Sequence, residues 1–499
     1  MLVGAAACHH GAGGIRRADL SLTVAAASLR SFHARRGLLL LAPAALGIQI
    51  LFGVAVAAKP LPVIGLALLA VGGLLALRRP DVVGFASIIA LALVPVYSVP
   101  SVGPLAGHPA VFASWIAAGA VLLAVVLGHG TLRMTVVDWA FAGLILALGL
   151  SVLAGAHPPS DFISLVWVTA GPYVGMRLLI PRMRADWLPR AFAVAALVAL
   201  PLAIHEAVTQ TNQFTGFVLN DGAGKVWATD QFRFGVLRVE GAFGHGIAMS
   251  MFAATVMLFA FGCAVLTGDR VRRRLWLAVF AGAAVMLAVT HSRTGFAVLG
   301  AGVLLTALGV ATGRARLRML AVCAALIAVA TPVLTVTGAG ESLMRLANDD
   351  RLDASTNYRE VLLERALRGE GLTLFGTEDS SLGAGIDSEG ASVDNMYLDV
   401  AADWGYVSLA GILAVVVALA ICLWRLRGAG AWSLLPMAAA ANFAGLFVVA
   451  FITQMEFYVW MLVGASSGAL ALVGEARART PSRTEALPPP RRRPVAARV

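Results

Sequence analysis

Charged residues are scarce in this chain of 499 residues. Only 13% of the residues are Asp, Glu, Lys or Arg, whereas 59% are hydrophobic and the mean hydropathy is +0.84. A soluble globular domain carries about 25% charged residues. This shortage of charge excludes a soluble protein and predicts an integral membrane protein.

Cysteines and cofactor motifs are also scarce. Cys8, Cys263, Cys323 and Cys422 are the four cysteines, and none is placed for an extracellular disulfide or a CxxC metal site. The sequence has no HExxH motif, no Walker loop and no convincing glycine fingerprint, so we expect neither a metal nor a cofactor. The net charge of +11 lies in short arginine clusters between apolar runs, a pattern that indicates membrane topology and not nucleic-acid binding.

Apolar runs of about 17 to 22 residues recur along the chain, which is the length an α-helix needs to cross ~30 Å of hydrocarbon. They lack the alternation of barrel strands. We therefore predict an all-α polytopic membrane protein with about fourteen transmembrane helices (12 to 14). The expected spans are residues 37–58, 61–77, 82–98, 110–127, 137–154, 162–180, 188–209, 244–266, 275–290, 295–312, 318–337, 405–424, 432–451 and 457–474.

The arginine clusters predict the orientation of these spans. With a cytoplasmic N-terminus, every cluster of three or more arginines falls on the cytoplasmic side, as the positive-inside rule requires. Both termini are then cytoplasmic, and the external side receives the two long polar segments. The predicted order is a cytoplasmic tail (1–36), an N-terminal transmembrane bundle (37–209), a first external loop (210–243), central transmembrane helices (244–338), a large external loop (339–404), C-terminal transmembrane helices (405–474) and a basic, proline-rich disordered cytoplasmic tail (475–499).

The large external loop is predicted to contain two short helices. Ser355 or Thr356 is a suitable N-cap, and an apolar stripe follows it, which favours an amphipathic helix over residues 356–368. Gly383, Gly385 and Gly390 predict a flexible segment after that helix. The second helix begins near Asp394 or Asn395 and leads into the next span.

Three arginines on the predicted external side stand at places that topology does not explain, because positive charge is otherwise kept inside: Arg238, Arg293 and Arg359. A guanidinium group can bind phosphate through a planar fork of donors, which favours an anionic substrate. The structural alternative is that each arginine reaches lipid headgroups or pairs with a carboxylate in a loop.

Four further side chains are candidates for the same site. Asp394 stands where the long loop re-enters the membrane, beside Asn395 and Tyr397, although an Asp at this place can also be only the N-cap of the short helix. His245 can donate a hydrogen bond to an oxyanion, or can serve only to begin a helix. Polar residues at the external ends of other spans are expected to line a cavity at this same site: His205, Glu206, Gln454 and Glu456.

Four ordered motifs carry a resemblance to a known family. They are Arg238-Val-Glu-Gly-Ala-Phe-Gly-His245; Thr290-His-Ser-Arg-Thr-Gly295; Ser355-Thr-Asn-Tyr-Arg359 with Leu374-Phe-Gly376; and Val393-Asp-Asn-Met-Tyr-Leu398 followed by Trp404-Gly405. Together they resemble the O-antigen ligase and Wzy-type polysaccharide polymerase superfamily of bacterial envelope proteins. The chain has Asp394 where the family usually has histidine, and Gly246-Ile247 where it has Pro-Asn after His245. These differences favour a polymerase-like or divergent member.

The resemblance implies a glycosyltransferase of the bacterial plasma (inner) membrane with a GT-C-like architecture. Such an enzyme moves a glycan from an undecaprenyl diphosphate-linked oligosaccharide to a hydroxyl of a glycan or lipid acceptor, with inversion and without metal. Arg238, Arg293 and Arg359 would then bind the diphosphate, Asp394 would orient or deprotonate the acceptor hydroxyl, and Asn395 and Tyr397 would hold sugar hydroxyls. Membrane lipids and other polysaccharide-assembly proteins are the further partners that the resemblance implies.

Two other classes of function stay open from the sequence. A transporter or flippase of lipid-linked sugars would share the polytopic architecture, but it should show inverted repeats and polar residues near the membrane midplane. In this chain the charges gather at the ends of the spans, and no internal repeat is detected. A non-catalytic membrane protein of envelope assembly is the other alternative.

Overall fold

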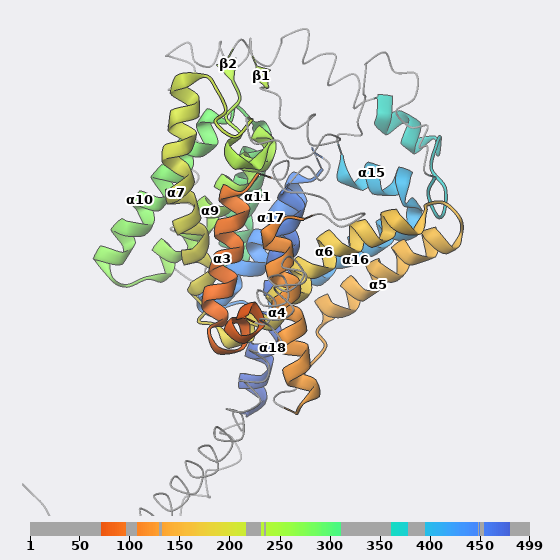
Figure 1. Ribbon diagram of the computed structural model, residues 1–499, viewed down its shortest axis with the longest axis horizontal. Coiled ribbons are helices and arrows are strands. Elements are labelled where there is room, and N and C mark those ends of the chain that lie inside the picture. The colour runs from red at the N-terminus through yellow and green to blue at the C-terminus, as the bar shows by residue number, and fades with distance from the viewer. Residues whose placement is uncertain are drawn as a thin grey trace, which may run out of the picture. The chain divides into compact units, whose positions relative to one another are not determined.

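The structure is a computed structural model that describes residues 71–95, 107–128, 132–215, 231–233, 236–310, 361–377, 395–447, 449 and 454–479. These residues form mainly helices (Figure 1). The α-helices are α3 (Pro80–Leu93), α4 (Pro109–Val126), α5 (Val136–Leu153), α6 (Pro159–Leu179), α7 (Trp187–Thr209), α9 (Gly246–Leu266), α10 (Arg270–Val289), α11 (Arg293–Leu305), α15 (Met396–Asp403), α16 (Gly405–Arg425), α17 (Leu434–Gly445) and α18 (Met455–Arg479).

Short elements connect several of these helices. Three are 3₁₀ turns, η2 (Ile180–Arg182), η3 (Gly241–Phe243) and η5 (Gly430–Ser433), and η4 (Thr306–Val310) is a π-turn that extends α11. One two-residue antiparallel pair joins β1 (Phe232–Arg233) to β2 (Val236–Leu237), just before η3. Residues 361–367 are helical, which agrees with the end of the helix predicted over 356–368.

Seven helices of the described ranges are long and apolar enough to cross a membrane. They are Pro109–Val126, Val136–Leu153, Pro159–Arg182, Trp187–Thr209, Gly246–Leu266, Gly405–Arg425 and Met455–Ala478. This confirms an all-α membrane protein.

The count of fourteen spans is not supported by these residues. The spans predicted at 37–58 and 318–337 lie outside the described residues, and 61–77 is described only from residue 71. α3, α11 and α17 have 14, 13 and 12 residues, which is too short to cross a bilayer alone. α10 has 20 residues, but four arginines stand among its first five.

The predicted span 432–451 shows the reason for the difference most clearly. Its apolar run folds into η5 and the shorter helix α17, which ends at Gly445. Most residues of α17 are buried, so their apolar character comes from contact with neighbouring helices and not from exposure to lipid. A helix that is apolar on all sides reads the same in sequence whether protein or lipid surrounds it.

Local signals explain where many helices begin. Proline occupies the first position of α3, α4 and α6, where its missing N–H costs no helical hydrogen bond. Thr135 and Asp138 form a reciprocal capping box at the start of α5. Asp269 caps α10 through its side chain, so this helix begins at Arg270 and not at the predicted residue 275.

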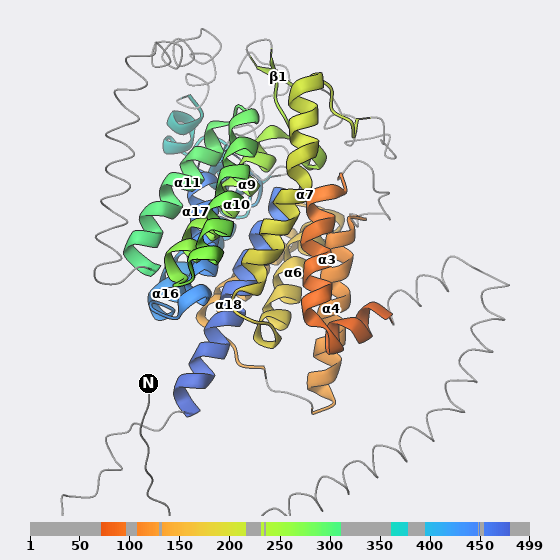
Figure 2. The ribbon, with the colours of Figure 1, turned by 90° about the vertical axis from the view of Figure 1, so that its left-hand side faces the viewer.

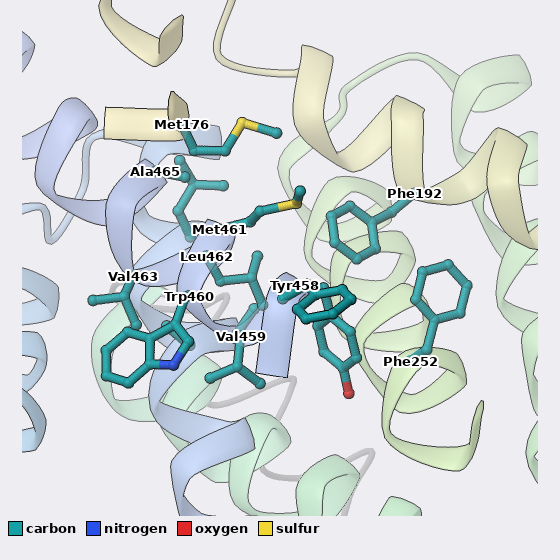
Figure 3. Packing of buried hydrophobic residues seen from close by; sticks show 14 of the residues in the cluster. Met176, Phe192, Phe252, Tyr458, Val459, Trp460, Met461, Leu462, Val463 and Ala465 are labelled. Atoms are coloured by element: carbon teal, nitrogen blue, oxygen red, sulfur yellow. The ribbon is translucent and has the colours of Figure 1, made fainter. Parts of the chain in front are cut away.

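α9 and α18 are the most buried of the seven long helices. α18 packs most extensively against α6, and α9 packs against α10 and α11 (Figure 2). Gly464 permits the first contact, because a Cβ atom there would overlap the Tyr173 carbonyl oxygen. Aromatic side chains join α9 to both α7 and α18: the Phe192 ring of α7 stacks on Phe252 of α9 at 5.4 Å, and Phe252 meets Tyr458 of α18 edge-on at 6.1 Å (Figure 3).

The helices have two distinct ends. We call one the η3 end, where α7 stops, η3 lies, and α9, α11 and α15 begin; the contacts given below join these segments. We call the other the arginine-rich end, where α5 begins and α6 and α16 stop. Described arginines gather at the second end: Arg133, Arg177, Arg182, Arg184, Arg190, Arg270, Arg272, Arg273, Arg274, Arg425, Arg427 and Arg477.

Candidate functional site

The first two motifs lie against each other at the η3 end. Val239 N donates a hydrogen bond to the Val289 carbonyl at 3.3 Å, so the segment before η3 runs beside the end of α10. A Cβ atom at Gly246 would lie 3.3 Å from the Thr290 carbonyl oxygen and 3.4 Å from the Arg238 guanidinium nitrogen Nε. The chain therefore brings Arg238 close to the turn that precedes Arg293.

Glu206, at the end of α7, fixes the conformation of the first motif. Its carboxylate is fully buried and accepts hydrogen bonds from Glu240 N and Gly241 N, both at 2.9 Å. Gln210 accepts a third bond from Leu237 N at 2.9 Å. Glu206 was expected to line the site, and the bonds described here show that it also supports the backbone of the first motif.

Gln454 has a comparable supporting role. It is buried at the start of α18 and donates from Nε2 to the Val94 carbonyl, beyond the end of α3. His108, the N-cap of α4, donates to the same carbonyl at 2.9 Å. The bonds described for Gln454 thus join α18 to the α3–α4 connection.

His245 is the N-cap of α9 and is 9% exposed. Its Nδ1 accepts a hydrogen bond from Ile247 N at 3.0 Å. Burial and then the charge of Arg238 lower the pKa of His245 to about 3, so the imidazole is neutral at physiological pH. Since Nδ1 is the acceptor, the single proton belongs on Nε2, and His245 has the form of a neutral hydrogen-bond donor.

Arg293 is the first residue of α11, and its side chain is exposed. The turn before it is tight, because His291 adopts a left-handed φ of 48°. Ser292 is buried with its Oγ 3.0 Å from Ser250 Oγ of α9, which holds the turn against α9. The fold therefore fixes the backbone of Arg293 and presents its guanidinium at the η3 end.

The predicted second loop helix is confirmed as α15, with Asn395 as its N-cap. Asn395 Oδ1 accepts from Tyr397 N at 2.9 Å and from Leu398 N at 3.3 Å. The Tyr397 hydroxyl donates to the Phe443 carbonyl at 2.9 Å, and its ring stacks on Phe447. Both side chains thus have structural bonds, and their contact with sugar hydroxyls stays a prediction.

α17 connects α15 to the turn at Arg293. Met396 N donates to the Leu446 and Val449 carbonyls, both at 3.2 Å, so α15 begins just beyond the end of α17. One residue earlier, a Cβ at Gly445 would lie 3.7 Å from Thr294 of α11. The structure therefore gathers Arg238, His245, Arg293 and the start of α15 at one end of the helices.

Arg359 and Asp394 lie outside the described residues, so their predicted places in this site stay predictions. Two other parts of the motifs that contain Arg359 and Asp394 are described, and these parts are in contact. Tyr406 N and Val407 N of α16 donate to the Thr373 and Leu374 carbonyls, at 3.1 and 3.2 Å. The Leu374–Gly376 segment therefore lies directly against the Trp404-Gly405 step.

Asp399 is a candidate that the sequence analysis did not single out. It lies on α15, one helical turn before Asp403. Burial and then the charge of Asp403 raise the pKa of Asp399 to about 7, so protonated and ionised forms coexist near neutral pH. The signal in the sequence was two carboxylates four residues apart in a short and otherwise mainly apolar helix.

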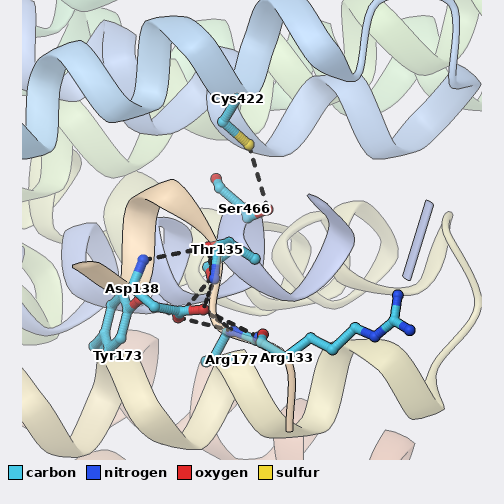
Figure 4. A network of polar contacts seen from close by, with 8 residues as sticks. Arg133, Thr135, Asp138, Tyr173, Arg177, Cys422 and Ser466 are labelled. Carbon is cyan, nitrogen blue, oxygen red and sulfur yellow. Dashed lines mark hydrogen bonds and ion pairs between the residues drawn. The ribbon is translucent and has the colours of Figure 1, made fainter. Parts of the chain in front are cut away.

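A second polar network lies at the arginine-rich end (Figure 4). Arg177 of α6 donates from Nε to Asp138 Oδ1 at 2.9 Å, and both side chains are less than a tenth exposed. Tyr173 and Ser467 donate to the same oxygen at 2.6 and 2.7 Å. Arg177 lies in the last turn of α6, within the predicted span 162–180. The signal was a pair of opposite charges placed in two neighbouring apolar runs.

No group of three or more His, Cys, Asp or Glu side chains that could hold a metal ion occurs within the described ranges. Comparison with protein-family models and with curated protein sequences finds no match for this chain.

Proposed function

We propose that this chain is a polymerase- or ligase-type glycosyltransferase. Its donor would be a glycan linked to undecaprenyl diphosphate, and its acceptor a hydroxyl of a glycan or lipid. The observation that carries the proposal is the grouping of Arg238, His245, Arg293 and α15 at one end of apolar, membrane-spanning helices. A polyprenyl chain suits the apolar helices, and a diphosphate suits the arginines.

The reaction needs three changes at the donor and acceptor. The acceptor oxygen forms a bond to the anomeric carbon, the bond from that carbon to the diphosphate oxygen breaks, and the hydroxyl proton passes to a base. The leaving group is undecaprenyl diphosphate, whose negative charge grows as the bond breaks. Positioned cations and hydrogen-bond donors stabilise such charge most when they are fixed in advance.

The residues supply these functions as follows. Arg238, Arg293 and Arg359 would bind the diphosphate, and neutral His245 would donate a further hydrogen bond to it. Asp394 would orient the acceptor hydroxyl and take its proton. Asn395 and Tyr397 would border the sugar at the start of α15.

Arg293→Ala is expected to lower glycan transfer by at least about 100-fold, because it removes one fixed donor from the developing charge. Purified protein in liposomes would be given lipid-linked oligosaccharide in the presence of a metal chelator, and the glycan products would be separated by length. Arg293→Lys keeps the charge but loses the planar fork, so it should restore only part of the activity.

The matched control is Arg272→Ala, which removes an exposed arginine from the arginine-rich end and should leave transfer unchanged. Full activity of Arg293→Ala, or dependence of the wild-type protein on a divalent metal, would contradict the proposed chemistry. Movement of the lipid-linked sugar across the bilayer without formation of a glycosidic bond would instead favour a flippase.

The proposed setting is the bacterial plasma membrane, with the spans in a GT-C-like arrangement and both termini in the cytoplasm. This orientation places the η3 end outside. A cysteine introduced at the exposed position His291 should then react with a membrane-impermeant maleimide on intact spheroplasts. A cysteine at Arg273 should react only after permeabilisation, and the reverse pattern would invert the topology. Cys263 and Cys422 are buried, which keeps their background labelling low.

A further inference from the structure

A pocket opens at the arginine-rich end between α4, α6 and α18. Both charged and apolar side chains line it, among them Leu132, Arg133, Arg177, Arg182, Leu472 and Glu475. It is far along the helices from η3 and α15, because α5 begins beside it and α6 ends there. The glycosyltransferase site proposed above does not use it.

The three arginines of this pocket differ in what they can bind. Arg177 is committed to the protein, since it donates to Asp138 from Nε and Nη2 and also to the Arg133 carbonyl. The Arg133 side chain extends away from this network and is exposed (Figure 4). Arg182 is also exposed and uses Nη1 for the Leu178 carbonyl at 2.8 Å, which leaves most of its five N–H donors for another partner.

The charge of the pocket favours an anion. Asp138 neutralises Arg177, so Arg133 and Arg182 supply two positive charges, and Glu475 is the only carboxylate among the lining residues. Phosphate oxygens are well matched by the planar fork of donors that each guanidinium group presents.

The apolar rim selects among phosphate compounds. Val125 and Leu132 line the pocket, and Val126 and Leu127 follow Val125 directly at the end of α4. Val126, Leu127 and Leu132 are all well exposed. A free phosphate ion has no use for this surface, whereas the acyl chains of a lipid do. Basic pockets between transmembrane helices are known sites for anionic headgroups. We propose that this pocket binds the phosphate of an anionic phospholipid, with Arg133 and Arg182 on the headgroup and its acyl chains along α4.

The experiment compares lipid binding by the intact, detergent-purified protein and by variants, with native mass spectrometry as the readout. Phosphatidylglycerol is the anionic probe, phosphatidylcholine is the neutral probe, and inorganic phosphate is the soluble competitor. The double variant Arg133→Ala/Arg182→Ala is expected to bind phosphatidylglycerol about 25-fold more weakly, because each arginine near a membrane surface contributes about a fivefold effect. Arg133→Lys/Arg182→Lys should recover part of that affinity.

Arg184→Ala/Arg190→Ala is the matched control. It removes the same charge from the same end, but these two arginines pair with Asp186 and do not line the pocket. Its phosphatidylglycerol affinity should equal that of the wild type. Equal losses in both double variants would overturn the pocket and indicate general surface charge. Equal binding of phosphatidylcholine, or displacement of the lipid by an equal concentration of inorganic phosphate, would overturn the lipid assignment.

Discussion

Replacing Arg177 with Met, or Asp138 with Asn, is expected to lower the free energy of unfolding by about 3–5 kcal/mol. Either change removes one partner of a buried ion pair and leaves the other charge without compensation. The cost is high here because the Asp138 carboxylate takes three hydrogen bonds from Arg177, one at 2.9 Å and two at 3.1 Å, together with those of Tyr173, Ser467 and the Thr135 backbone. Thermal unfolding in detergent, followed by far-ultraviolet circular dichroism, measures the effect.

The double variant Asp138→Asn/Arg177→Met should be more stable than either single variant, since no uncompensated charge remains. The exposed pair of Arg190 and Asp186 provides the control. Arg190→Met breaks an ion pair between residues four positions apart at the same end. This substitution should lower the free energy of unfolding by at most about 1 kcal/mol, because solvent screens both charges. If the effects of the two single substitutions simply add in the double variant, the buried pair is not coupled and the prediction is wrong.

The positions of the helices followed from the apolar runs of the sequence, and local signals at their starts agree with them. The predicted spans 137–154 and 188–209 differ from α5 and α7 by a single residue at most. Thr135 and Asp138 mark the first start through their capping box, and Asn395 marks the start of α15 through its side-chain bonds. These signals act over three or four residues, so a sequence shows them without a fold.

Pairing between distant segments could not be predicted in the same way. Asp138 and Arg177 are 39 residues apart, and Glu206 meets Glu240 and Gly241 at separations of 34 and 35. The sequence indicates only that each charge is costly in an apolar run. Which partner compensates it depends on how α5, α6 and α18, or α7 and η3, pack together.

The candidate site was predictable only where it depends on such local signals. Arg293 and Asn395 could be placed at helix starts, and the structure puts these starts at one end through α17. The sequence analysis did not predict that Glu206 accepts from backbone amides or that Gln454 donates to a backbone carbonyl. A sequence does not show whether a carboxylate or a carboxamide is buried. Arg359 and Asp394, which complete the predicted constellation, await test by activity.

Gly376→Ala is expected to detach the segment around Leu374 from the start of α16. It should lower the stability of this contact by about 3 kcal/mol or more. Gly376 has a φ of +84°, and a left-handed conformation alone costs Ala about 1–2 kcal/mol. In addition, a Cβ atom there would overlap the Asp403 carbonyl oxygen and approach Gly405 N at 2.8 Å. Both contacts are backbone atoms, so no side-chain rotation relieves them, and Gly405 has a φ of +83° itself.

Gly369→Ala separates these two contributions. Gly369 lies seven residues earlier with a φ of +74°, but a Cβ atom there would meet nothing within 4 Å. Hydrogen exchange of the Tyr406 and Val407 amides, which donate to Thr373 and Leu374, reports the attachment directly. Gly376→Ala should speed their exchange by about 100-fold or more, whereas Gly369→Ala should change it little. This contact joins the Leu374–Gly376 segment to the start of α16, next to α15, so a detached segment should also lower the proposed glycan transfer. Equal exchange in both variants would show that the close approach of Gly376 and Gly405 does not hold this segment.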